Sequence, residues 1–420
     1  TKSFENEMEN SKKLARANWK GSGDKSIEEK WFKIREQLQP TEFLGYEFQK
    51  AEGIVLKILK DNQFVETAKT GDKVEIITNQ TPFYGESGGQ VGDKGLIQTT
   101  DCKIHINDTQ KKVGDLFIHI GKIEKGSIKV GESVNLSIDV IRRNNSKANH
   151  SATHLLHESL RRTLGKHVTQ KGSLVSSEKL RFDFSHNKPI EKDEMSKINK
   201  IVNDFITGSS DVQTRIMTPK EAVGLGALAL FGEKYGDEVR VVFMGKENNG
   251  FFSTELCGGT HVKNTKEIGE FKVVSQSSIA SGVRRVEALR DKQLKNFEKS
   301  LNEEKISMDK NLSSQIKIKK NELNKLNIKL NFNNNFSLLE NLKNLNKQLD
   351  QAKVKNIIQN KNKIIDSKFD SIIFRQQVLT DLPPKELRAI VDQGKKEIKA
   401  GIIMACCIHE GKIGVAIGIT

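Results

Sequence analysis

Two pairs of side chains that can bind metals, each pair four residues apart, constrain the possible folds of this chain more than any other feature. His150 and His154 lie in a segment with a helical pattern, so their imidazoles project from one face, one turn apart. Cys257 and His261 enclose two glycines, whose access to positive φ suits a tight loop. Together the pairs supply three imidazoles and one thiolate, a tetrahedral Zn²⁺ set. Because 102 residues lie between His154 and Cys257, the metal can bind only after this whole stretch folds.

Composition and charge narrow the class of protein. The 420 residues allow roughly three domains of ordinary size. The net charge of +15 indicates a polyanionic partner, with simple solubility as the alternative. The four cysteines cannot build a disulfide framework, and neither a signal peptide nor a membrane-length apolar run occurs. We therefore expect a cytoplasmic protein with no membrane partner. The start at Thr1 and the end inside an apolar run predict a part of a longer protein.

The pattern of apolar residues predicts an α+β, multidomain chain. Short β-branched segments separated by turn residues predict a small antiparallel β-barrel, and a mixed helix and strand pattern follows it. Leucines at 3-4 spacing on both sides of the asparagine-rich residues 331–335 predict two helices that pack as an antiparallel coiled coil. The predicted parts are a helical connector (1–40), the β-barrel (41–140), an α/β core with the metal set (141–289), the helical hairpin (290–365) and a truncated βαββ domain (366–420).

The same pattern predicts individual elements. Barrel strands are expected at 54–59, 64–67, 73–77, 95–98, 103–106, 116–120 and 133–140. In the core, the histidine helix is expected to end at about Leu164, with helices at 192–207 and 219–228 and strands at 179–184, 238–243 and 268–275. The C-terminal part predicts strands at 372–379, 402–408 and 412–419 and a helix at 383–399. Residues 290–365 hold 17 Lys and Arg against 8 Asp and Glu, which indicates either a solvated arm or contact with RNA.

A glycine-rich segment, Tyr84-Gly85-Glu86-Ser87-Gly88-Gly89-Gln90, lies among the predicted barrel strands. One interpretation is a tight loop of the barrel. The other is a set of exposed backbone N–H groups that bind a ribose or a phosphate, with Gln90 as a polar contact. The sequence leaves both interpretations open.

Five motifs carry a resemblance to a known family. They are HSATHLLH (150–157), VTQKGS (168–173), LRFDFSH (180–186), ELCGGTHV (255–262) and IASGVRR (279–285). In these motifs and their order, and along essentially the whole chain, the sequence resembles the alanyl-tRNA synthetases. The resemblance implies the end of the tRNA-recognition helices, the barrel, a zinc-containing editing core, the coiled-coil arm and the start of a DHHA1-like C-terminal domain. Free-standing alanyl-tRNA editing proteins share the barrel and the zinc core, but residues 1–40 and the arm favour the synthetase.

The resemblance implies a function. Alanyl-tRNA synthetases attach alanine to tRNA(Ala) with ATP and Mg²⁺, but the class II motifs for that reaction would lie before Thr1. What remains implies binding of tRNA(Ala) and hydrolysis of mischarged seryl- and glycyl-tRNA. A second site is needed because a pocket sized for a methyl group discriminates against such small differences by only about 1–3 kcal/mol. The alternatives are a free-standing editing deacylase and a non-catalytic tRNA-binding module with structural zinc.

The resemblance also implies roles for single residues. The zinc ligands that it implies are His150, His154, Cys257 and His261. Gln170 matches a position at the editing pocket. Thr153 is a candidate to bond the seryl hydroxyl, or else an ordinary helix threonine that bonds its own backbone. His157, on the same helix face, is expected to be a buried polar residue near the ligands.

Candidates for contact with tRNA lie elsewhere in the same region. Arg181, Arg284 and Arg285 are expected to contact phosphates, with a solvated face of the protein as the alternative. Gln90 belongs to this group through the glycine-rich segment. A homo-oligomer formed through the C-terminal region is a further expectation of the resemblance. Whether the zinc is catalytic or structural stays open.

Overall fold

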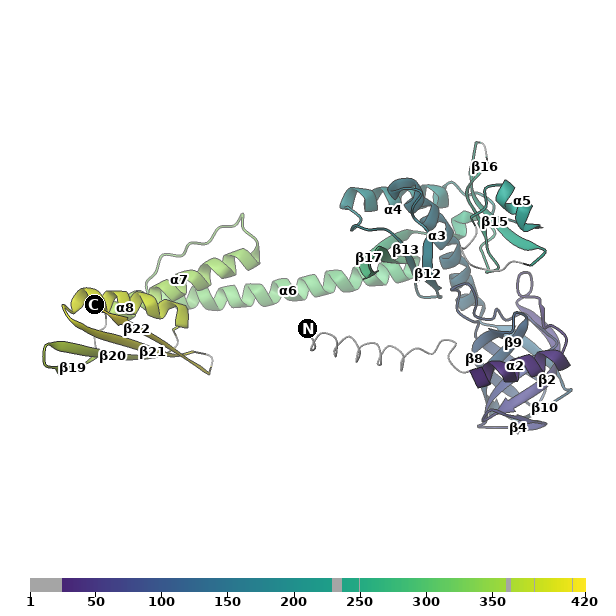
Figure 1. Cartoon of the computed structure of the whole chain (residues 1–420), viewed down its shortest axis with the longest axis horizontal. Helices are drawn as coiled ribbons and strands as arrows, with labels where there is room; N and C mark the ends of the chain where they lie inside the picture. Colours follow the sequence, from purple (N-terminus) through teal and green to yellow (C-terminus); the bar gives the residue numbers. More distant parts are fainter. Residues whose placement is uncertain (1–24, 229–235, 249, 360–363, 381, 410) are drawn as a thin grey trace. The chain divides into compact units, whose positions relative to one another are not determined.

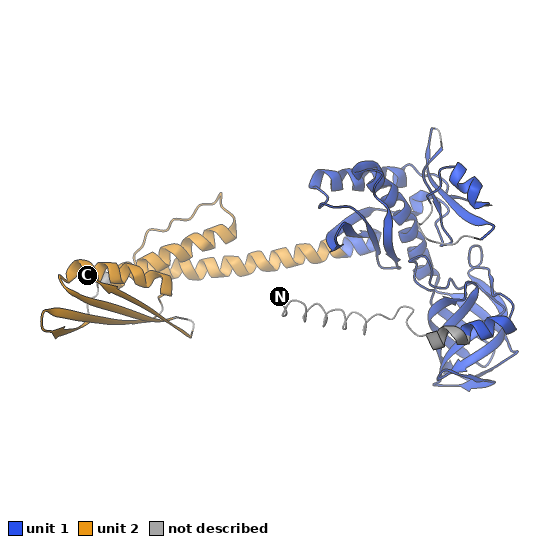
Figure 2. Ribbon diagram, viewed as in Figure 1, with its two compact units in different colours: residues 1–296 blue, residues 297–420 orange. Residues whose placement is uncertain are grey.

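The computed structural model describes residues 25–228, 236–248, 250–359, 364–380, 382–409 and 411–420. The chain divides into two compact units, Thr1–Asn296 and Phe297–Thr420 (Figure 2). The helical pattern predicted for residues 1–24 lies outside the described residues, and helix α2 (Lys25–Gln37) is the described part of that connector. Within the described ranges, no helix is both long enough and apolar enough to cross a membrane.

The predicted antiparallel barrel is confirmed (Figure 1). Its strands close in the order β11-β7-β8-β9-β5-β2, because β11 pairs with both β7 and β2. They are β2 (Lys50–Lys60), β5 (Lys73–Thr78), β7 (Gly95–Gln98), β8 (Lys103–Lys112), β9 (Leu116–Lys125) and β11 (Ser133–Ile138). Five shorter strands accompany them: β1 (Glu42–Phe43), β3 (Gln63–Val65), β4 (Thr67–Lys69), β6 (Gln80–Thr81) and β10 (Ser127–Lys129).

The barrel is held together by apolar residues on both faces of its strands. Side chains alternate between the two faces of a strand, so Ile58 and Ile76 belong to the cluster inside the barrel while their neighbours Leu59 and Ile77 do not. These neighbours form a second cluster with Trp31 and other residues of α2 and β9. Helix α2 therefore packs on the barrel by its apolar face.

Helix α3 (Val140–Leu164) follows the barrel directly and carries the histidines. The strand predicted to reach Val140 ends at Ile138, because the side chain of Asp139 accepts a hydrogen bond from Arg142 N and caps the helix. The predicted helix end at Leu164 agrees with the structure. The middle of α3 is buried although it contains three histidines, which places polar groups inside the protein.

The core beyond the barrel is mixed α/β. Its larger sheet has the order β12-β13-β18-β17, and helices α3 and α4 pack together beside it around one apolar cluster. A smaller sheet has the order β14-β15-β16. The elements are β12 (Gln170–Val175), β13 (Leu180–Ser185), α4 (Lys192–Thr207), β14 (Gln213–Met217), α5 (Pro219–Gly224), β15 (Val239–Glu247), β16 (Gly250–Leu256), η1 (Thr265–Ile268), β17 (Phe271–Ala280) and β18 (Val283–Arg290).

The strand predicted for 238–243 continues to Glu247, the strand predicted for 268–275 continues to Ala280, and strands β12, β14, β16 and β18 were not predicted. Local backbone features explain two further differences. The helix predicted for 219–228 ends at Gly224, where the backbone turns through Gly226 at φ 79°. The strand predicted from Ile268 starts at Phe271, because Asn264 caps the short helix η1 that ends at Ile268. Both differences arise from capping and turn residues, which the apolar pattern does not encode.

The second unit begins within helix α6 (Asp291–Lys325), which residues 326–337 connect to helix α7 (Leu338–Gln359). Ile316 and Leu323 of α6 form one buried cluster with Leu342, Leu345 and Leu349 of α7. The helical hairpin is therefore present, while a coiled coil stays a prediction.

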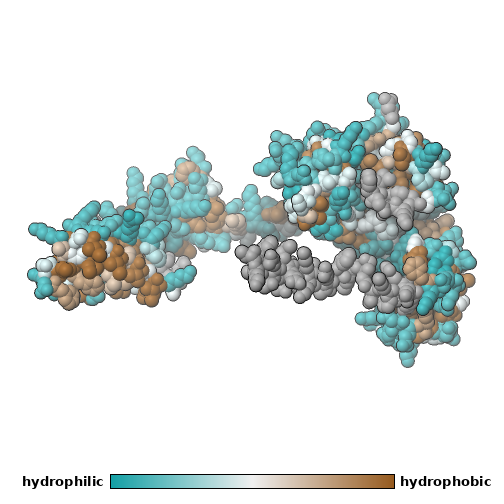
Figure 3. Space-filling view, in the orientation of Figure 1, coloured by the Kyte–Doolittle hydropathy of each residue, from teal (hydrophilic) through white to brown (hydrophobic). Residues whose placement is uncertain are grey.

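The C-terminal part contains a strand that was not predicted. A sheet with the order β19-β20-β21-β22 includes β19 (Ile364–Phe369), and β20 runs parallel to β21. The other elements are β20 (Ile372–Thr380), η3 (Pro384–Glu386), α8 (Leu387–Glu397), β21 (Gly401–His409) and β22 (Lys412–Ile419). Helix α8 packs on β21 and β22, whereas Ile413, Val415 and Ile417 are exposed in an apolar surface of the sheet (Figure 3).

The barrel should lose stability in acid because of His119. Burial lowers the pKa of this histidine to about 4, against about 6.5 in an unfolded chain. Between these values the unfolded chain binds more protons, so the free energy of unfolding falls as the pH falls, by about 2 kcal/mol at pH 5. Hydrogen exchange of peptides from β5 and β9, corrected for intrinsic rates, measures this loss. His119→Gln should flatten the pH dependence, and an unchanged dependence in that variant would contradict the assignment.

Candidate metal centre

Helix α3 brings four polar side chains to one buried face. His150 and His154 are one turn apart, and His157 follows on the next turn; they are 5%, 7% and 5% exposed. Thr153 lies beside them and is also buried. Neutral or charged imidazoles are costly to bury without partners, so each ring nitrogen needs an explanation.

The second half of the centre is the loop from Cys257 to His261, which follows β16. The guanidinium of Arg240 donates to the carbonyl oxygens of Cys257 and Gly259, each at 2.9 Å. Tyr46 of the barrel donates its hydroxyl to the carbonyl oxygen of Gly258 at 2.7 Å, and Arg240 lies over the Tyr46 ring. These contacts hold the loop backbone to β15 and to the barrel.

Gly259 is needed for a reason other than the predicted one, whereas a Cβ on Gly258 would meet no atom within 4 Å. Neither Gly258 nor Gly259 has a positive φ, so left-handed backbone does not explain them. A Cβ on Gly259 would lie 2.1 Å from Cε1 of His150. The loop therefore approaches α3 closely because Gly259 has no side chain.

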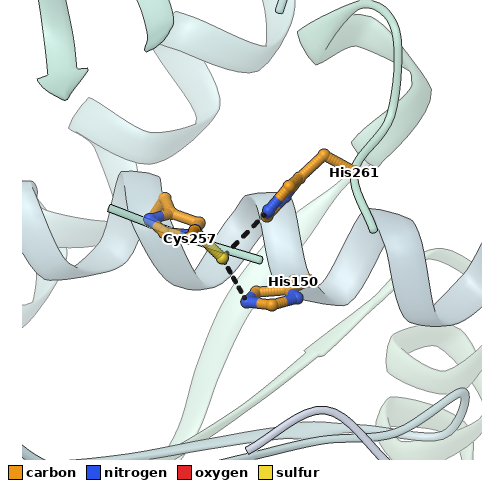
Figure 4. A group of neighbouring side chains, drawn as sticks. His150, Cys257 and His261 are labelled. Carbon is orange, nitrogen blue, oxygen red and sulfur yellow. Dashed lines mark hydrogen bonds between the residues drawn. The ribbon is translucent and has the colours of Figure 1, made fainter. Parts of the chain in front are cut away.

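The four predicted ligands come together. One ligand atom from each of His150, His154, Cys257 and His261 lies within 4.8 Å of the others. Cys257 Sγ is 3.4 Å from His150 Nε2 and 3.3 Å from His261 Nε2 (Figure 4). Nε2 of His154 is buried and has no hydrogen-bond partner among the described residues. A buried nitrogen without a partner beside a sulfur and two more nitrogens is what a metal-binding set requires, so these residues could hold a metal ion.

The outer nitrogens of the three histidines are held by other side chains. Nδ1 of His150 is 2.8 Å from Gln90 Oε1, and Nδ1 of His154 is 3.0 Å from Glu255 Oε2. Nδ1 of His261 is 3.2 Å from the hydroxyl of Ser151. Carbonyl and carboxylate oxygens only accept, so Nδ1 of His150 and of His154 carries the proton. Their Nε2 lone pairs are then available to a metal.

The charges of the site favour a thiolate at Cys257 and a neutral imidazole at His261. Burial opposes protonation of His154, but Glu255 and Cys257 raise its pKa to about 10, so this imidazole must release a proton when a metal binds. Burial opposes ionisation of Cys257, but the neighbouring His150, His261 and His154 lower the pKa of its thiol well below the ordinary value. Burial likewise opposes ionisation of Glu255, and His154 and His157 lower the pKa of that carboxyl well below its ordinary value. Burial lowers the pKa of His261 to about 3. A thiolate and a neutral imidazole are the forms in which these side chains coordinate metals.

A cavity of about 240 Å³ is lined by three of the four candidate ligands, His150, His154 and Cys257. Its lining includes the two predicted catalytic residues, Thr153 and Gln170, and also His157. The hydroxyl of Thr153 donates to the carbonyl oxygen of Asn149 at 2.8 Å, the local bond expected of a helix threonine. The side-chain amide of Gln170 lies 3.3 Å from Ser173 Oγ, next to a bulge in β12. Both roles stay predictions.

The predicted tRNA contacts do not line this cavity. On β18, Arg285 forms two hydrogen bonds with Asp183, and Arg181 lies 3.8 Å from the same carboxylate. Arg284 donates to Gln276 at 3.1 Å. Gln90 is 0% exposed and lies against the ligands instead of at the surface.

Several residues of the centre were not predicted. Glu255 stands two positions before Cys257, and an acidic residue beside a ligand motif is a usable signal for a side chain that holds a ligand. Ser151 lies within the histidine motif, directly after His150, and this position is a signal of the same kind. Arg240 and Tyr46 have no sequence signal, because their contacts with the loop arise only from the fold.

Comparison with known proteins agrees with the motifs. Residues 1–142 match the family model for class II (A) tRNA synthetases, and residues 239–287 match that for the threonyl and alanyl tRNA synthetase second additional domain. The chain is 43% identical to the alanine–tRNA ligase of Parvibaculum lavamentivorans, over 99% of the chain and 46% of that protein. It is 42% identical to the enzyme of Mesorhizobium japonicum and 43% identical to that of Sphingopyxis alaskensis, over 99% of the chain and 47% of each relative. The chain is thus similar to alanine–tRNA ligases along nearly its whole length, and it spans about half the length of the curated relatives that it matches.

Proposed function

We propose that this chain is the proofreading part of an enzyme that attaches alanine to tRNA(Ala) with ATP. Its own reaction would be hydrolysis of the ester bond that joins serine or glycine to tRNA(Ala). The observation that carries the proposal is the cluster of three histidines and one cysteine beside a cavity large enough for a small aminoacyl group. The match of residues 239–287 to the second additional domain supports the same assignment.

The need for such a reaction follows from the chemistry of alanine. Serine differs from alanine by one hydroxyl group and glycine by one methyl group. A single binding pocket separates such pairs by only about 1–3 kcal/mol, so mischarging must be corrected at a second site. That second site can select for the features that the first site fails to exclude.

Zn²⁺ is the metal that this donor set fits. His150, His154 and His261 with Cys257 form an N₃S group, in which one thiolate and three neutral imidazoles match tetrahedral zinc. When bound, zinc would supply Lewis acidity next to the ester carbonyl. The orphaned Nε2 of His154 and the oxygens that hold the outer nitrogens are the observations that support this fit.

Residues of the cavity would orient the aminoacyl group. The hydroxyl oxygen of Thr153 donates its proton to Asn149 and keeps its lone pairs, so it can accept a hydrogen bond from a seryl hydroxyl. Alanine offers no such donor. Gln170, from β12 on the cavity wall, has both a donor and an acceptor for the ester or the terminal ribose.

Positive charge would hold the tRNA. Residues 290–365 carry a net +9 of the chain's +15, and Arg181, Arg284 and Arg285 lie on the strands of the core sheet. Phosphate contacts of this kind supply affinity without sequence selectivity. The exposed apolar side chains of β22 support a homo-oligomer formed through the C-terminal region.

The proposed reaction can be tested directly. The purified chain should deacylate seryl- and glycyl-tRNA(Ala) faster than alanyl-tRNA(Ala), and it should not charge tRNA with alanine in the presence of ATP. Release of each labelled amino acid measures the first, and alanine incorporation measures the second. Binding of tRNA without any ester hydrolysis would identify a non-catalytic module instead.

The metal requirement can be separated from folding. Cys257→Ala removes the only sulfur of the set and should lower zinc content, with seryl ester hydrolysis falling at least about tenfold. The buried apolar cluster of the core should keep the variant folded by circular dichroism. Cys102→Ala, a buried free cysteine in the barrel, is the matched control and should retain zinc. Unfolding of Cys257→Ala, together with full activity of Gln170→Ala, would show that the metal is structural.

The role of Thr153 predicts a change in selectivity. Thr153→Val keeps the side-chain shape but removes the hydroxyl group. Hydrolysis of seryl-tRNA should fall about 5- to 10-fold relative to glycyl-tRNA, because one hydrogen bond contributes about 1–1.5 kcal/mol. Thr163→Val, on the same helix but outside the cavity lining, is the control. Equal losses for both substrates would contradict the assignment.

A further inference from the structure

Gln90 lies in the barrel segment of the chain, between β6 and β7, but its side chain contacts the metal centre. Its Oε1 is 2.8 Å from His150 Nδ1 and 2.9 Å from the backbone nitrogen of Thr260. Its Nε2 donates to the hydroxyl of Thr260 at 2.8 Å. One carboxamide therefore bonds to both halves of the centre, the helix and the loop, across 60 and 170 residues of sequence.

These contacts establish which way the carboxamide faces. The backbone N–H of Thr260 can only donate, so the atom that it meets must be the oxygen of Gln90. The same oxygen faces His150 Nδ1, which must then carry a proton. With the proton on Nδ1, Nε2 presents its lone pair towards Cys257 and the other ligands. Without an acceptor at Nδ1, the proton could move to Nε2 and block the metal-binding atom.

The glycine-rich loop is built to deliver this side chain. Gly89 has φ 85°, and a Cβ there would lie 2.0 Å from Ser173 Oγ. Val175 N donates to the carbonyl oxygen of Gly89 at 2.7 Å, and Val91 N donates to the carbonyl oxygen of Val175 at 3.0 Å. These backbone hydrogen bonds join the loop to the edge of β12. They fix the residues directly before and after Gln90, and so they fix the position of Gln90.

We infer that Gln90 is a positioning residue of the metal centre. Its carboxamide oxygen sets the tautomer of His150 and places the loop from Cys257 to His261. Docking of the barrel therefore controls the metal affinity of the core. This inference rests on the metal site of the proposed function. It gives the glycine-rich segment a role inside the protein, in place of the predicted contact with tRNA. Partners of this kind typically change metal affinity by about 10- to 100-fold.

Three variants of the full chain test the inference. Gln90→Met keeps much of the volume but loses the oxygen, and should weaken zinc binding at least about tenfold. Gln90→Glu keeps an oxygen that accepts from His150 and from the backbone of Thr260, and the hydroxyl of Thr260 can turn to donate to the second carboxylate oxygen. The added negative charge of the glutamate would face a zinc-loaded ligand set with a net charge of +1. This variant should bind zinc within about threefold of the unchanged chain. Gln80→Met is the control, a barrel glutamine that donates to the carbonyl oxygen of Glu52.

Zinc affinity is measured by competition with a chelator, and the absorption of bound Co²⁺ reports the ligand geometry. Gln90→Met should also weaken the tetrahedral Co²⁺ bands, while circular dichroism stays unchanged. If Gln90→Met binds zinc as tightly as the unchanged chain, or if Gln90→Glu fails as badly as Gln90→Met, the residue acts only by packing and the inference is overturned. If the Gln90 variants behave as expected but the zinc-loaded chain hydrolyses no ester, only the proposed function fails.

Discussion

A buried ion pair between Arg143 and Asp93 joins the barrel to the helix that carries the histidines. Arg143 is 1% exposed and lies in the first turns of α3, and its guanidinium also donates to the carbonyl oxygens of Gly45 and Pro82. The carboxylate of Asp93 accepts in addition from the backbone of Tyr84 at 2.7 Å. Loss of either partner would leave a buried charge alone, at a cost of about 3–5 kcal/mol. The same contacts set where the glycine-rich loop meets His150.

The metal centre depends on this junction because its parts come from separate elements. The helix supplies two candidate ligands, the loop after β16 supplies two, and the barrel supplies contacts from Tyr46 and Gln90. Apolar burial between α3, α4 and the larger sheet gives this region a core of its own. A bound metal would add chemistry to a framework that the apolar residues already define, so we expect that loss of a ligand and unfolding can be separated by experiment.

The sequence allowed the clustering of His150, His154, Cys257 and His261 to be predicted, because each pair has a local spacing of four. It also allowed most barrel strands to be predicted, since their side chains alternate over short distances. The partners that the barrel contributes to these side chains could not be predicted. Gln90 meets Thr260 across 170 residues, and only the packing of barrel against core brings them together. The same limit explains why β19 was not predicted and why β11 ends earlier than predicted. Pairing with β20 determines β19, and the cap of helix α3 determines the end of β11. Apolar periodicity encodes neither contact.

The order of the ligands along the chain has a consequence for biosynthesis. A ribosome that adds about 5–20 residues per second makes the 103 residues from His154 to Cys257 in about 5–20 s. Throughout that interval only His150 and His154 of the four candidate ligands have been made, a pair too small to retain a metal ion against cellular ligands. Metal capture is therefore delayed until the last ligand, His261, has been made and the loop has closed on the helix. Loading with metal would therefore mark a finished core.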